Sequence, residues 1–180
     1  MLVKRKHIRE RAVDILERFG VRKAPVPVEK LAERLGAKVI AESAPDDLSG
    51  FLVRDPHKNL VIIGVNADHH ENRRRFTIGH ELGHFLLHKG EHFHVDKRGG
   101  GYYLNMRDGK SGTRTNIDEM EANLFAAELL MPASFLKDDL KKHSAESISD
   151  EERIQTLAEK YKVSEQALTL RLTYLGYIEQ

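Results

Sequence analysis

The chain has 180 residues, with 29 lysines and arginines against 28 aspartates and glutamates, giving a formal net charge of +1. This balance excludes a protein that binds nucleic acid through a strong overall positive charge. There is no cysteine, which excludes disulfides and thiolate metal ligands and leads us to expect a cytoplasmic protein. The charged start predicts no signal peptide, and the longest clearly apolar run, residues 60–65, is too short for a membrane span.

The first half of the chain combines helices and short strands. Apolar residues recur at helical spacing over residues 5–19 and 28–35, with a glycine after each segment. Runs rich in β-branched and apolar residues predict strands at 37–41, 48–53 and 60–65.

A long helix is predicted over residues 69–88, with Asn66 or Asp68 near its start. It carries His80 and His84, which are four positions apart and therefore lie on one helix face. Imidazoles spaced in this way bind Zn²⁺, and Glu81, directly after the first histidine, can accept a proton from a water molecule. This is the H-E-x-x-H arrangement of metallopeptidases.

Two histidines are too few for a catalytic zinc ion, which usually has three protein ligands. The extended pattern H-E-x-x-H-x-x-G-x-x-H fails, since Leu87 replaces its glycine and Gly90 its third histidine. His88 continues the row of histidines, but eight residues of helix rise about 12 Å, too far for His80 and His88 to share an ion. We expect His88 to cap the helix or to contact a residue behind the ligands.

A carboxylate on a second helix, predicted over residues 117–130, is the remaining choice for a third ligand. Glu119 and Asn123 share one face of it, so Glu119 can bind the metal while Asn123 accepts a hydrogen bond from a ligand imidazole. Glu121 lies on roughly the opposite face and is the weaker candidate. Between the two helices, residues 89–115 are rich in glycine, histidine and charge, and they predict a mobile loop.

Two segments, Arg75 to His88 and Glu119 to Pro132, together closely resemble the ImmA/IrrE family of metallopeptidases, and residues 157–176 are similar to that family's C-terminal helices. The resemblance implies a zinc-dependent endopeptidase with a thermolysin-like ligand set. It also implies a substrate, a helix-turn-helix (Xre-like) transcriptional repressor whose cleavage derepresses stress, phage or mobile-element genes.

The expected fold is α+β and zincin-like: a small twisted sheet from about residues 37–65, backed by the active helix and the ligand helix. We assign residues 1–142 to the metallopeptidase domain and residues 143–180 to a helical appendage that resembles a helix-turn-helix. Further short helices are predicted at 133–142, 150–161 and 164–174. Acidic residues offset the basic ones in the appendage, so a docking surface for the substrate or a purely packing role is favoured over direct DNA binding.

The predicted chemistry is peptide-bond hydrolysis. Zn²⁺, or Mn²⁺ as a substitute, is expected on His80, His84 and Glu119, with Glu81 as the proton acceptor. An extended substrate is expected to pair with a strand edge beside the cleft. The oxyanion needs a hydrogen-bond donor, for which the candidates are Tyr102, Tyr103, His92 and His94. The alternative is a non-catalytic regulatory module in which zinc is structural and the protein binds a repressor or DNA.

Overall fold

The computed structural model describes residues 3–88, 93–97, 114–143 and 150–178. Within them the fold is mixed α and β, as predicted. The strands are β1 (Ala37–Glu42), β2 (Leu48–Asp55), β3 (Leu60–Asn66) and β4 (Phe93–Lys97). The helices are α1 (Arg5–Arg18), α2 (Val28–Arg34), α3 (Glu71–Leu87), α4 (Arg114–Leu130), α5 (Ala133–His143), α6 (Asp150–Tyr161) and α7 (Glu165–Tyr174).

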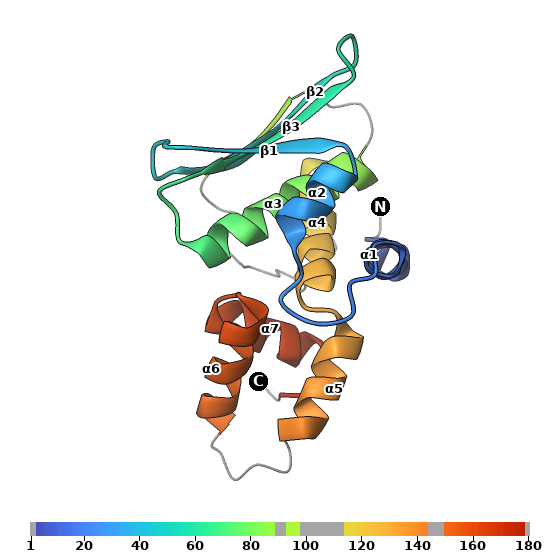
Figure 1. Ribbon diagram of the computed structural model, residues 1–180, viewed down its shortest axis with the longest axis vertical. Helices are drawn as coiled ribbons and strands as arrows, with labels where there is room; N and C mark the ends of the chain where they lie inside the picture. The colour runs from blue at the N-terminus through green and yellow to red at the C-terminus, as the bar shows by residue number, and fades with distance from the viewer. Residues whose placement is uncertain (1–2, 89–92, 98–113, 144–149, 179–180) are drawn as a thin grey trace.

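The four strands form one sheet in the order β1-β3-β2-β4. β1 runs parallel to β3, whereas β2 is antiparallel to both β3 and β4. In Figure 1 the sheet forms the upper layer, and α2, α3 and α4 lie together beneath it. The active helix and the ligand helix therefore back the sheet from one side, which is the predicted arrangement.

β4 corrects the prediction that residues 89–115 form a loop throughout. Its residues alternate between apolar and polar in the sequence Phe-His-Val-Asp-Lys, a strand pattern that the glycine-rich and charged neighbours obscured. The strand pairs with β2, so that Val95 lies opposite Phe51. It places His94 on the sheet.

The start of α3 also differs from the expectation. The helix begins at Glu71, and the cap is His70, whose Nδ1 accepts a hydrogen bond from the backbone N–H of Asn72 at 3.2 Å. Asn66 was a wrong choice for the cap, because its amide donates to the carbonyls of Ala44, Pro45 and Leu48 and so ties together the loop before β2.

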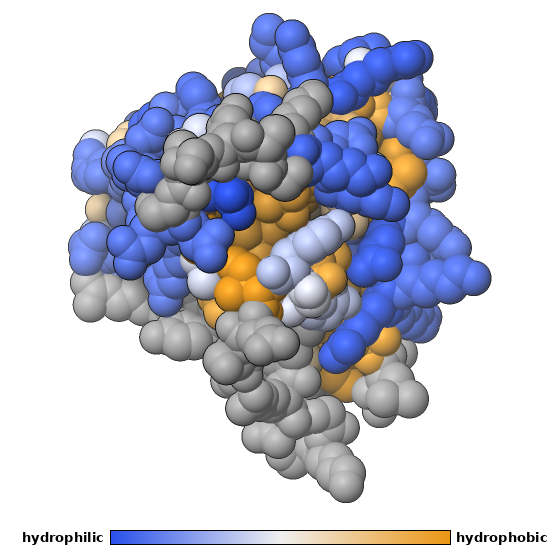
Figure 2. Space-filling model, turned by 90° about the horizontal axis from the view of Figure 1, so that it is seen from below, coloured by the Kyte–Doolittle hydropathy of each residue, from blue (hydrophilic) through white to orange (hydrophobic). Residues whose placement is uncertain are grey.

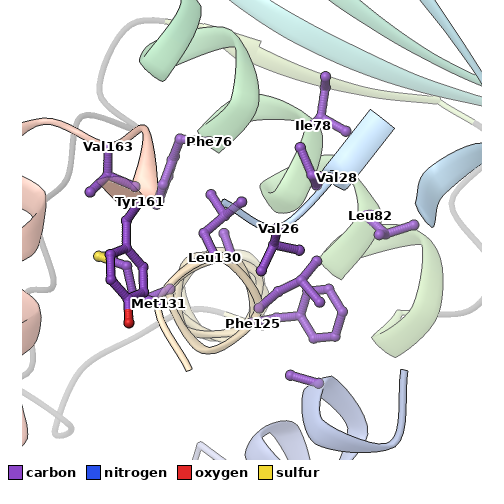
Figure 3. Packing of buried hydrophobic residues seen from close by; sticks show 14 of the residues in the cluster. Val26, Val28, Phe76, Ile78, Leu82, Phe125, Leu130, Met131, Tyr161 and Val163 are labelled. Carbon is purple, nitrogen blue, oxygen red and sulfur yellow. The ribbon is translucent and has the colours of Figure 1, made fainter. Parts of the chain in front are cut away.

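The hydrophobic core surrounds α4. Buried side chains of the sheet, including Leu52 and Ile63, pack in the same cluster as those of α3 and α4. Figure 3 shows α4 nearly end-on, with Phe125 and Leu130 pointing into this cluster. Burying such side chains contributes about 1.5–3 kcal/mol each, so α4 is held firmly in place.

The last three helices lie below the layer of α3 and α4 in Figure 1. Tyr161 and Leu168 are fully buried and belong to the same hydrophobic cluster as the rest of the core. Seen from below, in Figure 2, this end of the molecule is largely hydrophilic, with a hydrophobic area near its centre. None of the described helices combines the length and the apolar character that a membrane span requires.

Candidate metal centre

The histidines of the H-E-x-x-H motif lie side by side on α3. Residues 75–84 of this helix are all buried, because it passes between the sheet and α4. The Nε2 atoms of His80 and His84 are 3.1 Å apart. One helical turn therefore brings two imidazole nitrogens to a single point.

Glu119 comes to the same point from α4. One carboxylate oxygen lies 3.4 Å from His80 Nε2, and the other lies 3.2 Å from His84 Nε2. The imidazoles are 2–3% exposed, whereas the Glu119 side chain is 36% exposed. The centre is therefore enclosed on the side of α3 and open to solvent on the side of Glu119.

Two glycines allow α4 to come this close to α3. A Cβ atom added to Gly83 would lie 2.9 Å from the Cα of Ala122, and one added to Gly79 would lie 3.3 Å from the Cβ of Ala126. Because glycine has no side chain, the two helix backbones approach each other closely along this line. That approach lets a glutamate on α4 reach two histidines on α3.

Asn123 fixes the orientation of the first imidazole. Its Oδ1 lies 2.9 Å from His80 Nδ1 and can only accept, so Nδ1 carries the hydrogen and the lone pair of Nε2 faces Glu119. Glu119 and Asn123 are four residues apart on one face of α4, which explains why both reach the centre.

The protonation states favour a cation at this point. Burial lowers the pKa of His84 to about 4, so its imidazole is neutral at pH 7. Burial by itself would raise the pKa of Glu119, but the neighbouring imidazoles of His80 and His84 outweigh this and lower it, so the carboxylate is ionised. A neutral imidazole and an ionised carboxylate are ligands that zinc prefers, so His84 and Glu119 fit a divalent metal ion.

His94 is a fourth group at the centre. Its Nε2 lies 3.3 Å from a carboxylate oxygen of Glu119, and its ring stacks on that of His84 with centroids 3.8 Å apart. One donor atom from each of His80, His84, His94 and Glu119 lies within 4.8 Å of the others. Of the four candidate oxyanion donors, the structure brings His94 to the centre, and His92, Tyr102 and Tyr103 lie outside the described residues.

Comparison with known proteins decides the family. Residues 32–173 match the model of the peptidase M78 family, described as the IrrE N-terminal-like domain. The chain belongs to the peptidase M78 family. A metallopeptidase family implies a metal ion, and the cluster of histidines and Glu119 is where the M78 chain can bind one.

Two further proteins are similar to this M78 chain. Immunity region protein 2 of Bacillus phage phi105 is 31% identical over 105 residues, which make up 57% of each chain. The M78 chain thus matches somewhat more than half the length of that curated relative. A Mycobacterium tuberculosis transcriptional regulator of known structure shares the fold, with a TM-score of 0.63 and 17% identity over 93% of this chain and 46% of the other.

Glu81, the acid of the H-E-x-x-H motif, is fully buried on α3. It faces the sheet, since a Cβ atom added to Gly50 on β2 would lie 3.8 Å from Glu81 Oε1. Glu121, the weaker ligand candidate, lies away from the three ligand candidates, and its Oε1 accepts a hydrogen bond from the backbone N–H of Lys4 at 3.1 Å.

Arg54 is a further residue near the centre that the sequence pattern did not indicate. Its guanidinium reaches from β2 to the end of α3 and donates to the backbone carbonyls of His84, at 2.6 Å, and His88, at 2.8 Å. The partners that it meets at the end of α3 are backbone carbonyls, which leave no mark in the sequence. An isolated arginine near the end of a predicted strand gives no signal of such a contact.

Proposed function

We propose that this M78 protein is a zinc-dependent endopeptidase, with His80, His84 and Glu119 as metal ligands and Glu81 as the general base. The observation that carries the proposal is the convergence of two imidazole nitrogens and a carboxylate within 3.1–3.4 Å of one another, with Glu81 directly after the first histidine. Three protein ligands leave a position for a substrate or a water molecule, as in catalytic zinc sites.

The proposed reaction divides the work between the ion and the chain. A zinc ion bound there would supply Lewis acidity, which polarises the scissile carbonyl and makes water more acidic. Glu81 would take the proton from the attacking water and return it to the leaving amine. His94, next to Glu119, is the proposed donor to the oxyanion.

The substrate is expected to bind as an extended segment along β4. This strand is the last in the order β1-β3-β2-β4, so within the described part of the chain no further strand covers its outer edge. A peptide that paired with this edge would run past His94, and hence past Glu119.

A helix-turn-helix repressor is the proposed substrate. The relative from phage phi105 is named for an immunity region, which supports a role in the control of a repressor. A peptidase of this kind in the cytoplasm would need to be selective. We propose that residues 143–180 supply a second contact with the folded substrate.

The decisive experiment compares the cleavage of casein with that of a helix-turn-helix repressor encoded beside this gene, using the zinc-loaded protein. We expect the repressor to be cut at few positions and casein slowly or not at all.

Glu81→Gln should keep the metal and abolish cleavage, because an amide cannot accept the proton. Glu33→Gln, at an exposed position on α2, is the matched control and should cleave normally. Rapid digestion of casein, or substantial cleavage by zinc-loaded Glu81→Gln, would contradict the proposal.

A non-catalytic regulatory module remains the second candidate, and the position of His94 favours it. Structural zinc sites usually have four protein ligands, and His94 stands where it could provide the fourth. Such a protein would bind a repressor or DNA without cutting it. A chain that holds zinc through His94 and leaves every repressor intact would support this second function.

A further inference from the structure

Behind the metal centre, a chain of hydrogen bonds joins β2, the end of α3 and α4. It begins with Arg54, whose Nη2 donates to the carbonyls of His84, at 2.6 Å, and His88, at 2.8 Å. The last carbonyls of a helix have no partner within it, and a positive charge there is favourable. Arg54 thus supplies both a donor and a charge to the final turn of α3.

His88 continues the chain of contacts to α4. Its backbone is extended, and its N–H donates to the carbonyl of His84 at 3.2 Å. The ring, which is 11% exposed, turns towards Asp118. Nε2 lies 3.1 Å from the backbone carbonyl of Asp118 and must donate to it, since a carbonyl only accepts, while Nδ1 lies 3.5 Å from the Asp118 carboxylate.

The two ends of this chain of contacts adjoin two proposed ligands. Arg54 holds the carbonyl of His84 itself, and Asp118 directly precedes Glu119. His84 lies three residues from the end of α3, and Glu119 lies five residues from the start of α4. Helix ends fray more readily than helix interiors, so the distance between these two ligands needs support from outside the helices.

We propose that Arg54 and His88 are positioning residues that hold His84 and Glu119 at the separation a metal ion requires. The inference rests on the proposed metal site, but not on peptide cleavage. Neither residue touches the ion or the substrate. Both act through backbone carbonyls, one of a ligand and the other of a ligand's neighbour. Partners behind the ligands of other metal sites affect metal affinity by about 10- to 100-fold.

The test uses two polar replacements of His88 in the full chain. Glutamine places its amide N–H₂ close to the position of Nε2 and can still donate to the Asp118 carbonyl, whereas asparagine is too short. We expect His88→Asn to weaken zinc binding by about 10- to 100-fold and His88→Gln to retain most of the affinity. His57→Asn, at an exposed turn, is the matched control and should bind zinc normally.

Zinc affinity is measured by competition with a chelator, and the geometry of the site by the visible spectrum of the Co²⁺-loaded protein. Thermal unfolding of the metal-free variants shows whether the fold itself has changed. If His88 positions the two ligands, the Co²⁺ spectrum should be altered in His88→Asn and normal in His88→Gln. Equal zinc affinity in both variants and in the original protein would overturn the proposal.

Arg54 gives an independent check. Arg54→Met should also weaken zinc binding, and the double variant Arg54→Met/His88→Asn should be less impaired than the sum of the two single changes, because both residues act on one structure. Strictly additive losses of zinc affinity would contradict the proposal that Arg54 and His88 act together.

The number of zinc ions per chain shows whether His88 instead binds a second ion. His88, Asp118 and Glu121 each offer one ligand atom within 4.8 Å of the others. Two zinc ions in the original protein and one in His88→Asn would show that His88 holds an ion of its own, which would overturn its proposed positioning role. A protein whose single zinc ion depends on Arg54 and His88 but that cleaves no repressor would instead contradict only the proposed function.

Discussion

Among the residues of α4, Glu119 and Glu121 are two positions apart and have different surroundings. Glu119 faces His80 and His84, while Glu121 meets the backbone of Lys4 and lies 4.0 Å from His88. Replacing each glutamate in turn therefore tests which of the two is the third metal ligand.

Glu119→Ala is expected to lower zinc affinity by at least about 100-fold, because Glu119 is the proposed third ligand itself rather than a partner behind a ligand. Glu121→Ala should change the affinity little. Metal analysis of the two purified variants after dialysis against a weak chelator provides the measurement. The opposite order of affinities would assign the third ligand to Glu121.

His94 separates the two candidate functions. If it donates to the oxyanion, His94→Phe should retain one zinc ion and lower kcat for repressor cleavage by about 10²- to 10³-fold, with KM nearly unchanged. The check is steady-state kinetics together with metal content. Loss of the zinc ion from His94→Phe would instead identify His94 as a fourth ligand and favour the regulatory module.

Helical spacing accounts for how much of the centre could be predicted. His80 and His84, or Glu119 and Asn123, share a face wherever a helix forms, so their proximity within each pair follows from the sequence. The meeting of the two pairs does not follow from spacing. It was expected because the two histidines needed a third ligand and a second helix offered a carboxylate, and the resemblance to a known family implied the same. The contact of Arg54 with the end of α3 could not be predicted, because it is made to backbone carbonyls.

At the scale of elements, the approach of α3 to α4 governs the site. A Cβ atom added to Gly83 would lie 2.9 Å from the backbone of Ala122, whereas one added to Gly79 would lie 3.3 Å from Ala126 Cβ and 3.4 Å from its Cα. The contact at Gly83 is the closer one, so the two glycines should differ in their tolerance of a methyl group.

Gly83→Ala should push α4 away from α3 and weaken zinc binding by at least about tenfold, since its Cβ would lie 2.9 Å from Ala122 Cα and 3.1 Å from the Ala122 carbonyl oxygen. Gly79→Ala meets a Cβ atom at 3.3 Å and should have a much smaller effect. Zinc titration of both variants, with circular dichroism to verify folding, provides the measurement. Equal affinities would show that the glycines do not set the distance between the ligands.

The predicted helices agree with the structure to within a few residues, because each has a clear apolar face and a stop signal such as Gly20 or Pro132. β4 was missed for the opposite reason. Five residues with two apolar positions are too short to stand out from a polar segment, and the strand exists because β2 offers it an edge for pairing. Such pairing between distant segments cannot be read from local pattern.

For the molecule as a whole, one buried ion pair links the last helix to the ligand helix. Arg171 on α7 is fully buried and donates to both carboxylate oxygens of Glu128 on α4, at 2.6 and 3.0 Å. Its Nε also donates to the carbonyl of Met131 at 3.1 Å, and Arg9 on α1 contacts Glu128 from the other side. Three helices thus meet at a single carboxylate.

Arg171→Met should lower the free energy of unfolding by about 3–5 kcal/mol, because it leaves a buried carboxylate without its main partner. The double variant Arg171→Met/Glu128→Met should recover a large part of this loss, since both charges are then gone. Urea unfolding of the metal-free proteins at pH 7 provides the measurement. If the double variant were no more stable than the single one, the cost would lie in packing rather than in the unpaired charge.

This ion pair limits how the protein can diversify. Glu119 and Glu128 are nine residues apart on one rigid helix, about 13.5 Å along its axis. A family member that exchanged its terminal helices for those of a relative would need a matching acid at position 128, or the graft would bury an arginine alone. Exchange of the terminal helices as a whole is therefore disfavoured. If residues 143–180 contact the substrate as proposed, new specificities are expected to arise by point substitution on the outward faces of α6 and α7, with Arg171 and Glu128 left intact.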